Sequence, residues 1–159
     1  MAQVNFTDRE MQRAWKNNLK ASEHSLCDKD NNAYRLLLFY AIECGLKAVL
    51  MKRRSATCTE ELFSRAVTRA NHNINNLLDD LTAGSSLKLP KQLKINSIRV
   101  QGKEVARSID VEQINQVWRY GGCFIPPSSN SVSEIIKDDD LEKKLMRISQ
   151  WIKQELRQQ

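Results

Sequence analysis

The sequence has few of the residues that interrupt helices. Its 159 residues contain only five glycines and three prolines, whereas leucine, isoleucine, lysine, arginine and glutamate are abundant. This composition favours an all-α protein. The length fits one domain with a sizeable hydrophobic core. We therefore expect a single helical domain over residues 1–159, an antiparallel bundle of about five helices.

The sequence also lacks the short motifs of several enzyme classes. It has no glycine-rich phosphate loop, no local signature of a Ser-His-Asp triad and no carboxylate cluster suited to two metal ions. A zinc site could combine His24, Cys27, Cys58 and His72, but these residues lack the paired spacing of zinc motifs. Nucleotide hydrolysis and ordinary hydrolase chemistry are therefore disfavoured, and we expect no metal and no cofactor.

Disulfide and targeting patterns are absent as well. The four cysteines are scattered without paired spacing, and the opening MAQVNFTDREMQ has no basic-then-apolar signal pattern. Both features indicate a reducing compartment, so we expect a cytoplasmic protein.

The most apolar stretch, residues 33–50, is too short to span a membrane. A span needs about 20 apolar residues, and this stretch carries Glu43 and Lys47 in its middle. It is therefore expected to be the central, buried helix of the bundle. The two charges have the i,i+4 spacing of a helical ion pair. Buried, they need each other or a partner such as Arg119, which favours a structural role over a functional one.

Other helices are predicted from apolar periodicity and capping residues. They cover residues 8–26, 57–70, 74–83, 110–120 and 138–157, with an interruption at Asn71-His72-Asn73. Residues 85–109 are the least helical, because Pro90 interrupts them and apolar residues alternate around Gln101-Gly102. That pattern predicts a basic loop or a short hairpin insertion.

The 85–109 insertion carries a local excess of positive charge. It contains six cations and only one acid, Glu104. The cations are Lys88, Lys91, Lys94, Arg99, Lys103 and Arg107. Such an excess can recruit phosphates or an acidic partner protein. The alternative is a solvated loop kept soluble by its charges.

Three short motifs resemble the HEPN (higher eukaryotes and prokaryotes nucleotide-binding) superfamily. Residues 40–50, YAIECGLKAVL, are similar to the family's "YAiE.aLKAll" core helix, and residues 72–78, HNINNLL, to its "H-(D/N)-L-x-x-L" helix start. Trp118-Arg119-Tyr120 resembles the late "RY" element. The resemblance implies a small antiparallel helical bundle, and it covers most of the chain except residues 85–109.

The resemblance also implies a functional setting. Many members are metal-independent endoribonucleases that act as dimers through an Arg and a His separated by four to six residues, late in the bundle. Members without that pair act as binding or scaffold subunits. The settings are defence systems, toxin–antitoxin pairs and nucleotidyltransferase-associated operons.

This chain lacks the family's pair at its late position, because no histidine follows Arg119. The spacing occurs elsewhere, between Arg65 and His72, and these two are the candidate catalytic residues. A histidine in this position is more often a packing or helix-start residue, and that interpretation of His72 is favoured over a catalytic one. Arg119 with Tyr120 could bind a phosphate and stack on a base, or Arg119 could pair with an acid such as Glu43 and fix a loop.

We therefore expect an RNA-binding or scaffold component of a prokaryotic defence or toxin–antitoxin system, a homodimer or a subunit of a larger assembly. Its candidate nucleic-acid contacts are Arg119, Tyr120, Lys52, Arg53, Arg54, Lys88, Lys91, Lys94, Arg99, Lys103 and Arg107. Two alternatives remain open. One is a metal-independent endoribonuclease that uses Arg65 and His72, and the other is a subunit whose basic segment docks on an acidic protein.

Overall fold

The computed structural model describes residues 5–24, 32–63, 72–126 and 137–158. These ranges contain the helices α1 (Asp8–His24), α2 (Ala33–Arg54), α3 (Thr59–Phe63), α4 (Ile74–Asp80), α5 (Ile114–Arg119) and α6 (Asp138–Arg157). They also contain the strands β1 (Gln92–Val100), β2 (Lys103–Asp110) and β3 (Phe124–Ile125), and two 3-10 turns, η2 (Ser85–Leu87) and η3 (Val111–Gln113).

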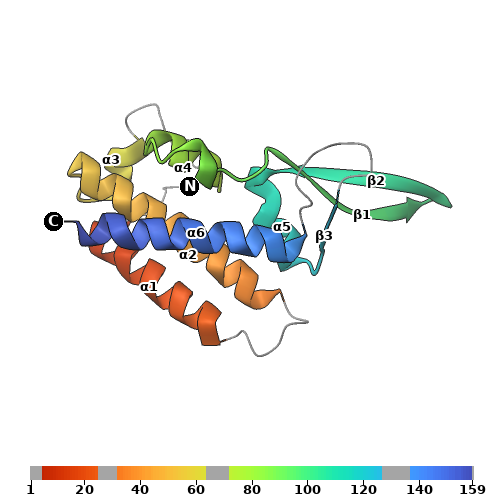
Figure 1. Cartoon of the computed structure of the whole chain (residues 1–159), viewed down its shortest axis with the longest axis horizontal. Coiled ribbons are helices and arrows are strands. Elements are labelled where there is room, and N and C mark those ends of the chain that lie inside the picture. The colour runs from red at the N-terminus through yellow and green to blue at the C-terminus, as the bar shows by residue number, and fades with distance from the viewer. Residues whose placement is uncertain (1–4, 25–31, 64–71, 127–136, 159) are drawn as a thin grey trace.

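Helix α2 is the centre of the fold, as its continuous apolar sequence predicts. It runs between α1 and α6 (Figure 1), and it also contacts α3, α4 and α5. Phe39, Ile42 and Leu46 have no exposed surface, so α2 packs against neighbours on several sides. Gly45 permits the closest approach, because a Cβ there would lie 2.9 Å from atoms of both Trp15 and Ile152.

The expectation of an all-α bundle is wrong. A three-stranded antiparallel sheet in the order β2-β1-β3 accompanies the helices. An isolated hairpin would be marginally stable, but here the base of β1 pairs with β3 through Ile95 and Phe124. Leu93 and Phe124 are buried in the common core, so the sheet is anchored by packing.

The insertion of residues 85–109 is mainly a hairpin, one of the two forms that the sequence predicts, but its strands of nine and eight residues are longer than the short hairpin expected. Strands β1 and β2 pair from Gln92↔Asp110 to Val100↔Lys103, with an irregularity between Ile95 and Ile98. The two-residue loop has Gln101 at φ 49° and Gly102 at φ 78°. Two positive φ values match the twist of antiparallel strands.

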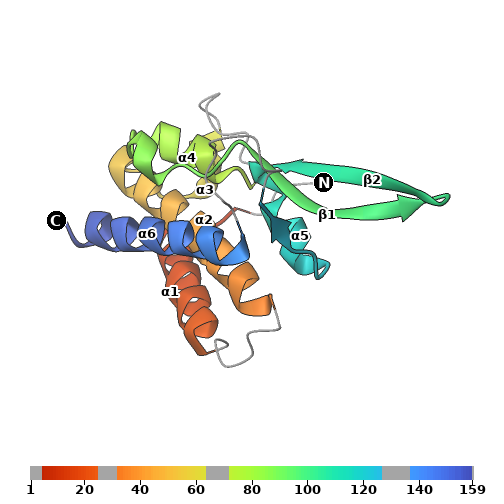
Figure 2. The same ribbon diagram turned by 45° about the vertical axis from the view of Figure 1, so that its right-hand side comes forward.

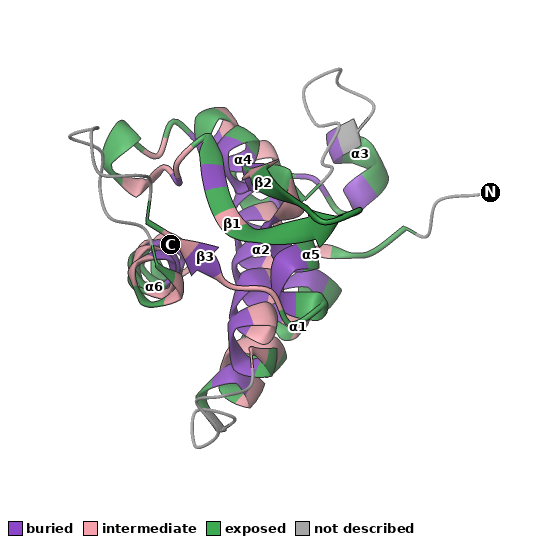
Figure 3. Ribbon diagram, turned by 90° about the vertical axis from the view of Figure 1, so that its right-hand side faces the viewer, coloured by how far each residue is buried: buried purple, intermediate pink, exposed green. Residues whose placement is uncertain are grey.

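The hairpin projects away from the helices (Figures 1 and 2). We call residues 91–110 the basic arm. Apart from Leu93, Ile95 and Ile109, every residue of the arm is exposed, and most of its ribbon is green in Figure 3. Its base therefore belongs to the core, while its outer part extends away from the helical body.

Several helix ends match the sequence patterns. Asn73 caps α4 by accepting a hydrogen bond from the backbone N–H of Asn76, and Thr7 and Glu10 exchange capping hydrogen bonds at the start of α1. The expected helix over 57–70 is described only as α3, since residues 64–71 lie outside the described ranges. Among the described residues, no helix is long and apolar enough to cross a membrane.

Candidate functional site

A polar stripe runs along one face of the mainly apolar middle of helix α2. It consists of Tyr40, Glu43 and Lys47. With spacings of three and four residues, each side chain is rotated from the next by at most about one sixth of the helix circumference. Two residues from other elements bind this stripe: His72, just before α4, and Arg119, the last residue of α5. The stripe thus joins the three motifs of the HEPN resemblance in one place.

Glu43 is the buried centre of the stripe. Its side chain is 8% exposed, and its carboxylate binds Lys47 Nζ at 2.6 Å through Oε1 and His72 Nδ1 at 2.9 Å through Oε2. Burial raises the pKa of Glu43, but the charge and hydrogen bond of Lys47 and the hydrogen bond of His72 outweigh burial and hold this pKa below its ordinary value. The carboxylate therefore stays ionised and orients the His72 ring.

His72 is both positioned and accessible. Its backbone has φ 48°, in the left-handed region, and its side chain is 51% exposed. Since Nδ1 faces Glu43, Nε2 lies on the other side of the ring. A carboxylate that orients an imidazole in this way is a common arrangement for general acid–base chemistry.

Arg119 lies beside the stripe at the next turn of α2. Its Nη2 donates a 2.6 Å hydrogen bond to the Tyr40 hydroxyl, and this bond raises the pKa of Arg119. Tyr40 and Glu43 are three residues apart, about 4.5 Å along the helix axis, so Arg119 and His72 are anchored on neighbouring turns. Tyr120, next to Arg119, is 79% exposed.

The structure confirms the suggested pair of Glu43 with Lys47 and replaces the suggested pair of Arg119 with Glu43. Arg119 binds Tyr40 rather than Glu43, and Glu43 binds Lys47 together with His72. Arg65 lies outside the described residues, so the Arg65–His72 pair stays a prediction. The sequence analysis missed the Glu43–His72 contact, whose only signal was that both residues belong to motifs of the HEPN resemblance.

The basic arm holds most of the remaining candidate cations. Lys91, Lys94, Arg99, Lys103 and Arg107 are all exposed. Arg99 lies opposite Glu104 in the register, and Arg107 Nε donates to the Asn96 carbonyl at 2.8 Å. Ile98, Val100 and Val105, each more than 40% exposed, lie among these cations. The arm therefore presents positive charge and apolar surface together.

The cations at the end of α2 stabilise the fold. Lys52 Nζ donates to the Glu155 and Leu156 carbonyls at 3.1 and 3.3 Å. Arg53 binds Glu155 and the Leu81 carbonyl, each at 2.6 Å. Burial raises the pKa of Asp80 above its ordinary value, and the nearby charge of Arg54 opposes this rise only in part.

Lys88 is also engaged by the fold, since it forms an ion pair with Asp79 at 2.5 Å. Together with the cations of α2, it belongs to the helical body rather than to the basic arm. Lys52, Arg53 and Lys88 therefore have structural partners that the sequence did not reveal.

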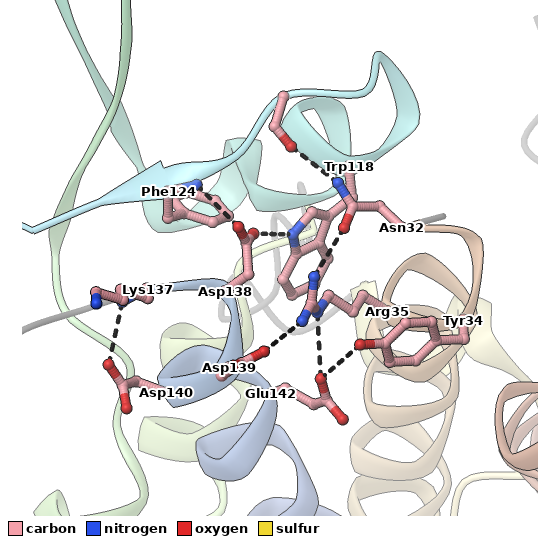
Figure 4. A network of polar contacts seen from close by, with 11 residues as sticks. Asn32, Tyr34, Arg35, Trp118, Phe124, Lys137, Asp138, Asp139, Asp140 and Glu142 are labelled. Atoms are coloured by element: carbon pink, nitrogen blue, oxygen red, sulfur yellow. Dashed lines mark hydrogen bonds and ion pairs between the residues drawn. The ribbon is translucent and has the colours of Figure 1, made fainter. Parts of the chain in front are cut away.

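A second polar network joins α6 to its neighbours (Figure 4). Arg35 binds Asp139 at 2.6 Å and Glu142 at 3.1 Å, and Tyr34 donates to the same Glu142. Next to them, the Trp118 indole N–H donates to Asp138 at 2.7 Å. The first turn of α6 thereby fixes α2 and α5, which position the stripe and Arg119.

Other chemistry is not supported near the stripe. Burial, with a smaller effect of Glu43, raises the pKa of the Cys44 thiol to about 11, so this cysteine is protonated and a poor nucleophile. Over the described ranges, no three His, Cys, Asp or Glu side chains are grouped so that they could hold a metal ion. Cys27, one of the residues considered for zinc, lies outside those ranges.

Comparison of the chain with family models, with curated proteins and with solved structures gives no match. The HEPN resemblance therefore stays a prediction from the three sequence motifs.

Proposed function

We propose that this protein binds RNA through the basic arm, with Arg119 and Tyr120 as a further contact region. The observation that carries this proposal is the arm itself, a ribbon with five exposed cations that extends beyond the helical body. Lysine and arginine side chains neutralise phosphates and release counterions. Exposed Ile98, Val100 and Val105 offer apolar contact to unstacked bases. A role in a defence or toxin–antitoxin system is proposed from the HEPN resemblance alone.

Removal of two arm charges is expected to weaken RNA binding and its dependence on salt. In Arg99→Gln/Lys103→Gln, affinity for a single-stranded RNA should fall about tenfold or more at low salt, since hydrogen bonds to charged groups are worth about 1.5–3 kcal/mol. The slope of log affinity against log salt should become shallower by about 1.4. Fluorescence anisotropy of a labelled RNA at several salt concentrations measures both quantities.

The matched control removes two exposed cations from the helical body, Lys143→Gln/Arg147→Gln. This variant has the same net charge as the arm variant, and its RNA affinity should stay close to that of the wild type. Equal losses in both variants would show that net charge, rather than the arm, attracts RNA. Absence of RNA binding together with arm-dependent binding of an acidic protein would favour the docking-subunit alternative.

A second candidate function, metal-independent RNA cleavage, is favoured by the hydrogen bond between Glu43 and His72. His72 Nε2 would accept the proton of a ribose 2′-hydroxyl while the 2′-oxygen bonds to phosphorus. The 5′-oxygen would leave and take a proton from water, giving a 2′,3′-cyclic phosphate and a 5′-hydroxyl. Arg119 would stabilise the charge on the phosphorane.

Cleavage of RNA in EDTA tests this second candidate. Loss of an activating base or a charge-stabilising donor typically costs about 100-fold or more, so His72→Ala and Arg119→Ala should each reduce cleavage to that extent. Arg65→Ala tests the sequence-based pair in the same assay. Unchanged cleavage in His72→Ala, with an unchanged circular dichroism spectrum, would exclude a catalytic role for His72.

A further inference from the structure

A groove lies between α1 and the last turns of α6, and the function proposed above does not use it. It has a volume of about 570 Å³. Its lining residues come only from these two helices: Gln12, Trp15, Lys16, Leu19, Lys20, Glu23, Lys153, Leu156 and Arg157. The C-terminal end of α6 and the basic arm lie at opposite ends of the molecule (Figures 1 and 2). The groove is therefore a separate surface.

The floor of the groove is apolar. Leu19 and Leu156 are partly buried and pack against the core, and Trp15 is 5% exposed. Because so little of the Trp15 ring is accessible, it offers no open face on which a nucleic-acid base could stack. This floor suits aliphatic side chains better than bases.

The rim of the groove is positively charged on both sides. Lys16 and Lys20 are four residues apart on α1, and Lys153 and Arg157 are four residues apart on α6. Residues spaced by four lie on one face of a helix, about 6 Å apart along its axis. All four are exposed, and the groove contains one acid, Glu23. Two rows of cations thus flank the apolar floor, and in each row the cations have the four-residue spacing of one helix face.

We infer that this groove binds an acidic amphipathic helix of a partner protein. An apolar stripe of such a helix would fill the floor, as in other helix-in-groove complexes. Acidic residues at i,i+4 spacing on both sides of the stripe would meet the two rows of cations. Charge complementarity of this kind favours acidic partners over basic ones and speeds association. The inference does not depend on RNA binding by the arm.

A designed peptide tests this inference with the full-length chain. The probe is a fluorescein-labelled peptide of about four helical turns, with leucines in one helical stripe and glutamates on both sides of it. Its control has the same composition, in an order that spreads the leucines around the helix. We expect saturable binding of the amphipathic peptide and at least tenfold weaker binding of the control.

Charge reversals locate the binding surface. Lys16→Glu/Lys153→Glu changes one cation in each row and should weaken peptide binding at least tenfold. Lys143→Glu/Arg147→Glu reverses two exposed cations of α6 that do not line the groove, and it should bind the peptide nearly as well as the wild type. Hydrogen exchange should slow in α1 and α6 when the peptide binds.

Several results would overturn the inference. No saturable peptide binding, equal affinity of the two peptides, or equal losses in the two charge-reversal variants would each do so. Displacement of the peptide by single-stranded RNA, with RNA affinity lowered tenfold in Lys16→Glu/Lys153→Glu but not in its control, would assign the groove to nucleic acid. A dimer that dissociates only in Lys16→Glu/Lys153→Glu would assign it to a second copy of the chain.

Discussion

Replacement of Gly45 by valine is expected to lower the free energy of unfolding by about 3 kcal/mol, the upper part of the range for overpacked cores. A Cβ at this position would lie 2.9 Å from Ile152 Cδ1, Ile152 Cγ2 and Trp15 Cδ1. Real Cβ atoms essentially never make contacts this short, so the Trp15 and Ile152 side chains, or the helices that carry them, would have to shift. Urea unfolding followed by circular dichroism measures the loss.

A double-mutant cycle tests the cause. Gly45→Ala gains about 1 kcal/mol of helix propensity but still places a Cβ against Trp15 and Ile152. Ile152→Val removes Cδ1, one of the three crowded atoms, at a cost of about 1 kcal/mol on its own. If crowding matters, the double variant should be more stable than the sum of the single effects predicts, by about 0.5 kcal/mol or more. Simple additivity would show that the site relaxes without strain.

The central helix could be predicted from the sequence, but its contacts could not. A long apolar run over residues 33–50 indicates a buried helix, and the cations Lys52-Arg53-Arg54 after it predict its end. The structure confirms both, since α2 runs from Ala33 to Arg54. The i,i+4 pair of Glu43 and Lys47 was visible in the sequence and is present. His72 lies 29 residues from Glu43, and its contact depends on how α4 packs against α2. No local pattern encodes that packing.

The sheet could be predicted only in part, for a different reason. The alternation of apolar and polar residues on both sides of Gln101-Gly102 corresponds to a real hairpin, because side chains along a strand alternate with a period of two residues. Strand β3 has only two residues, Phe124 and Ile125, and two residues carry no periodicity. Its pairing comes from burial of Phe124 in the core, a tertiary effect. The all-α expectation failed because the anchor of the hairpin is too short to be recognised.

The basic residues also fall into two groups, those that bind the fold and those that stay exposed, and only tertiary packing separates them. A run such as Lys52-Arg53-Arg54 looks alike in sequence whether it binds a ligand or the fold. In the structure, Lys52 and Arg53 contact residues about 100 positions away, near the end of α6. The arm cations lie on a ribbon whose outer part has no core to contact, so they stay exposed.

Lys47→Met is expected to lower the free energy of unfolding by about 3 kcal/mol at pH 7, because it leaves Glu43 buried without its strongest partner. In the wild type the pKa of Glu43 lies below its ordinary value. The carboxylate therefore contributes stability at neutral pH that is lost as the pH falls through its pKa in the folded state. Without Lys47, burial dominates and should raise that pKa above its value in the unfolded chain.

The expected pH dependence of the stability of Lys47→Met follows from this rise in the pKa of Glu43. A carboxyl whose pKa is raised by folding makes the protein more stable as the pH falls, so the deficit of Lys47→Met should shrink between pH 7 and pH 4. Glu43→Gln/Lys47→Met has no charge at either position, and its deficit should lack the contribution of a buried carboxylate. Urea unfolding of the three proteins at pH 4, 5.5 and 7 separates these effects. An equal deficit of Lys47→Met at all three values would mean that Lys47 contributes packing alone, and that Glu43 is held ionised by other means.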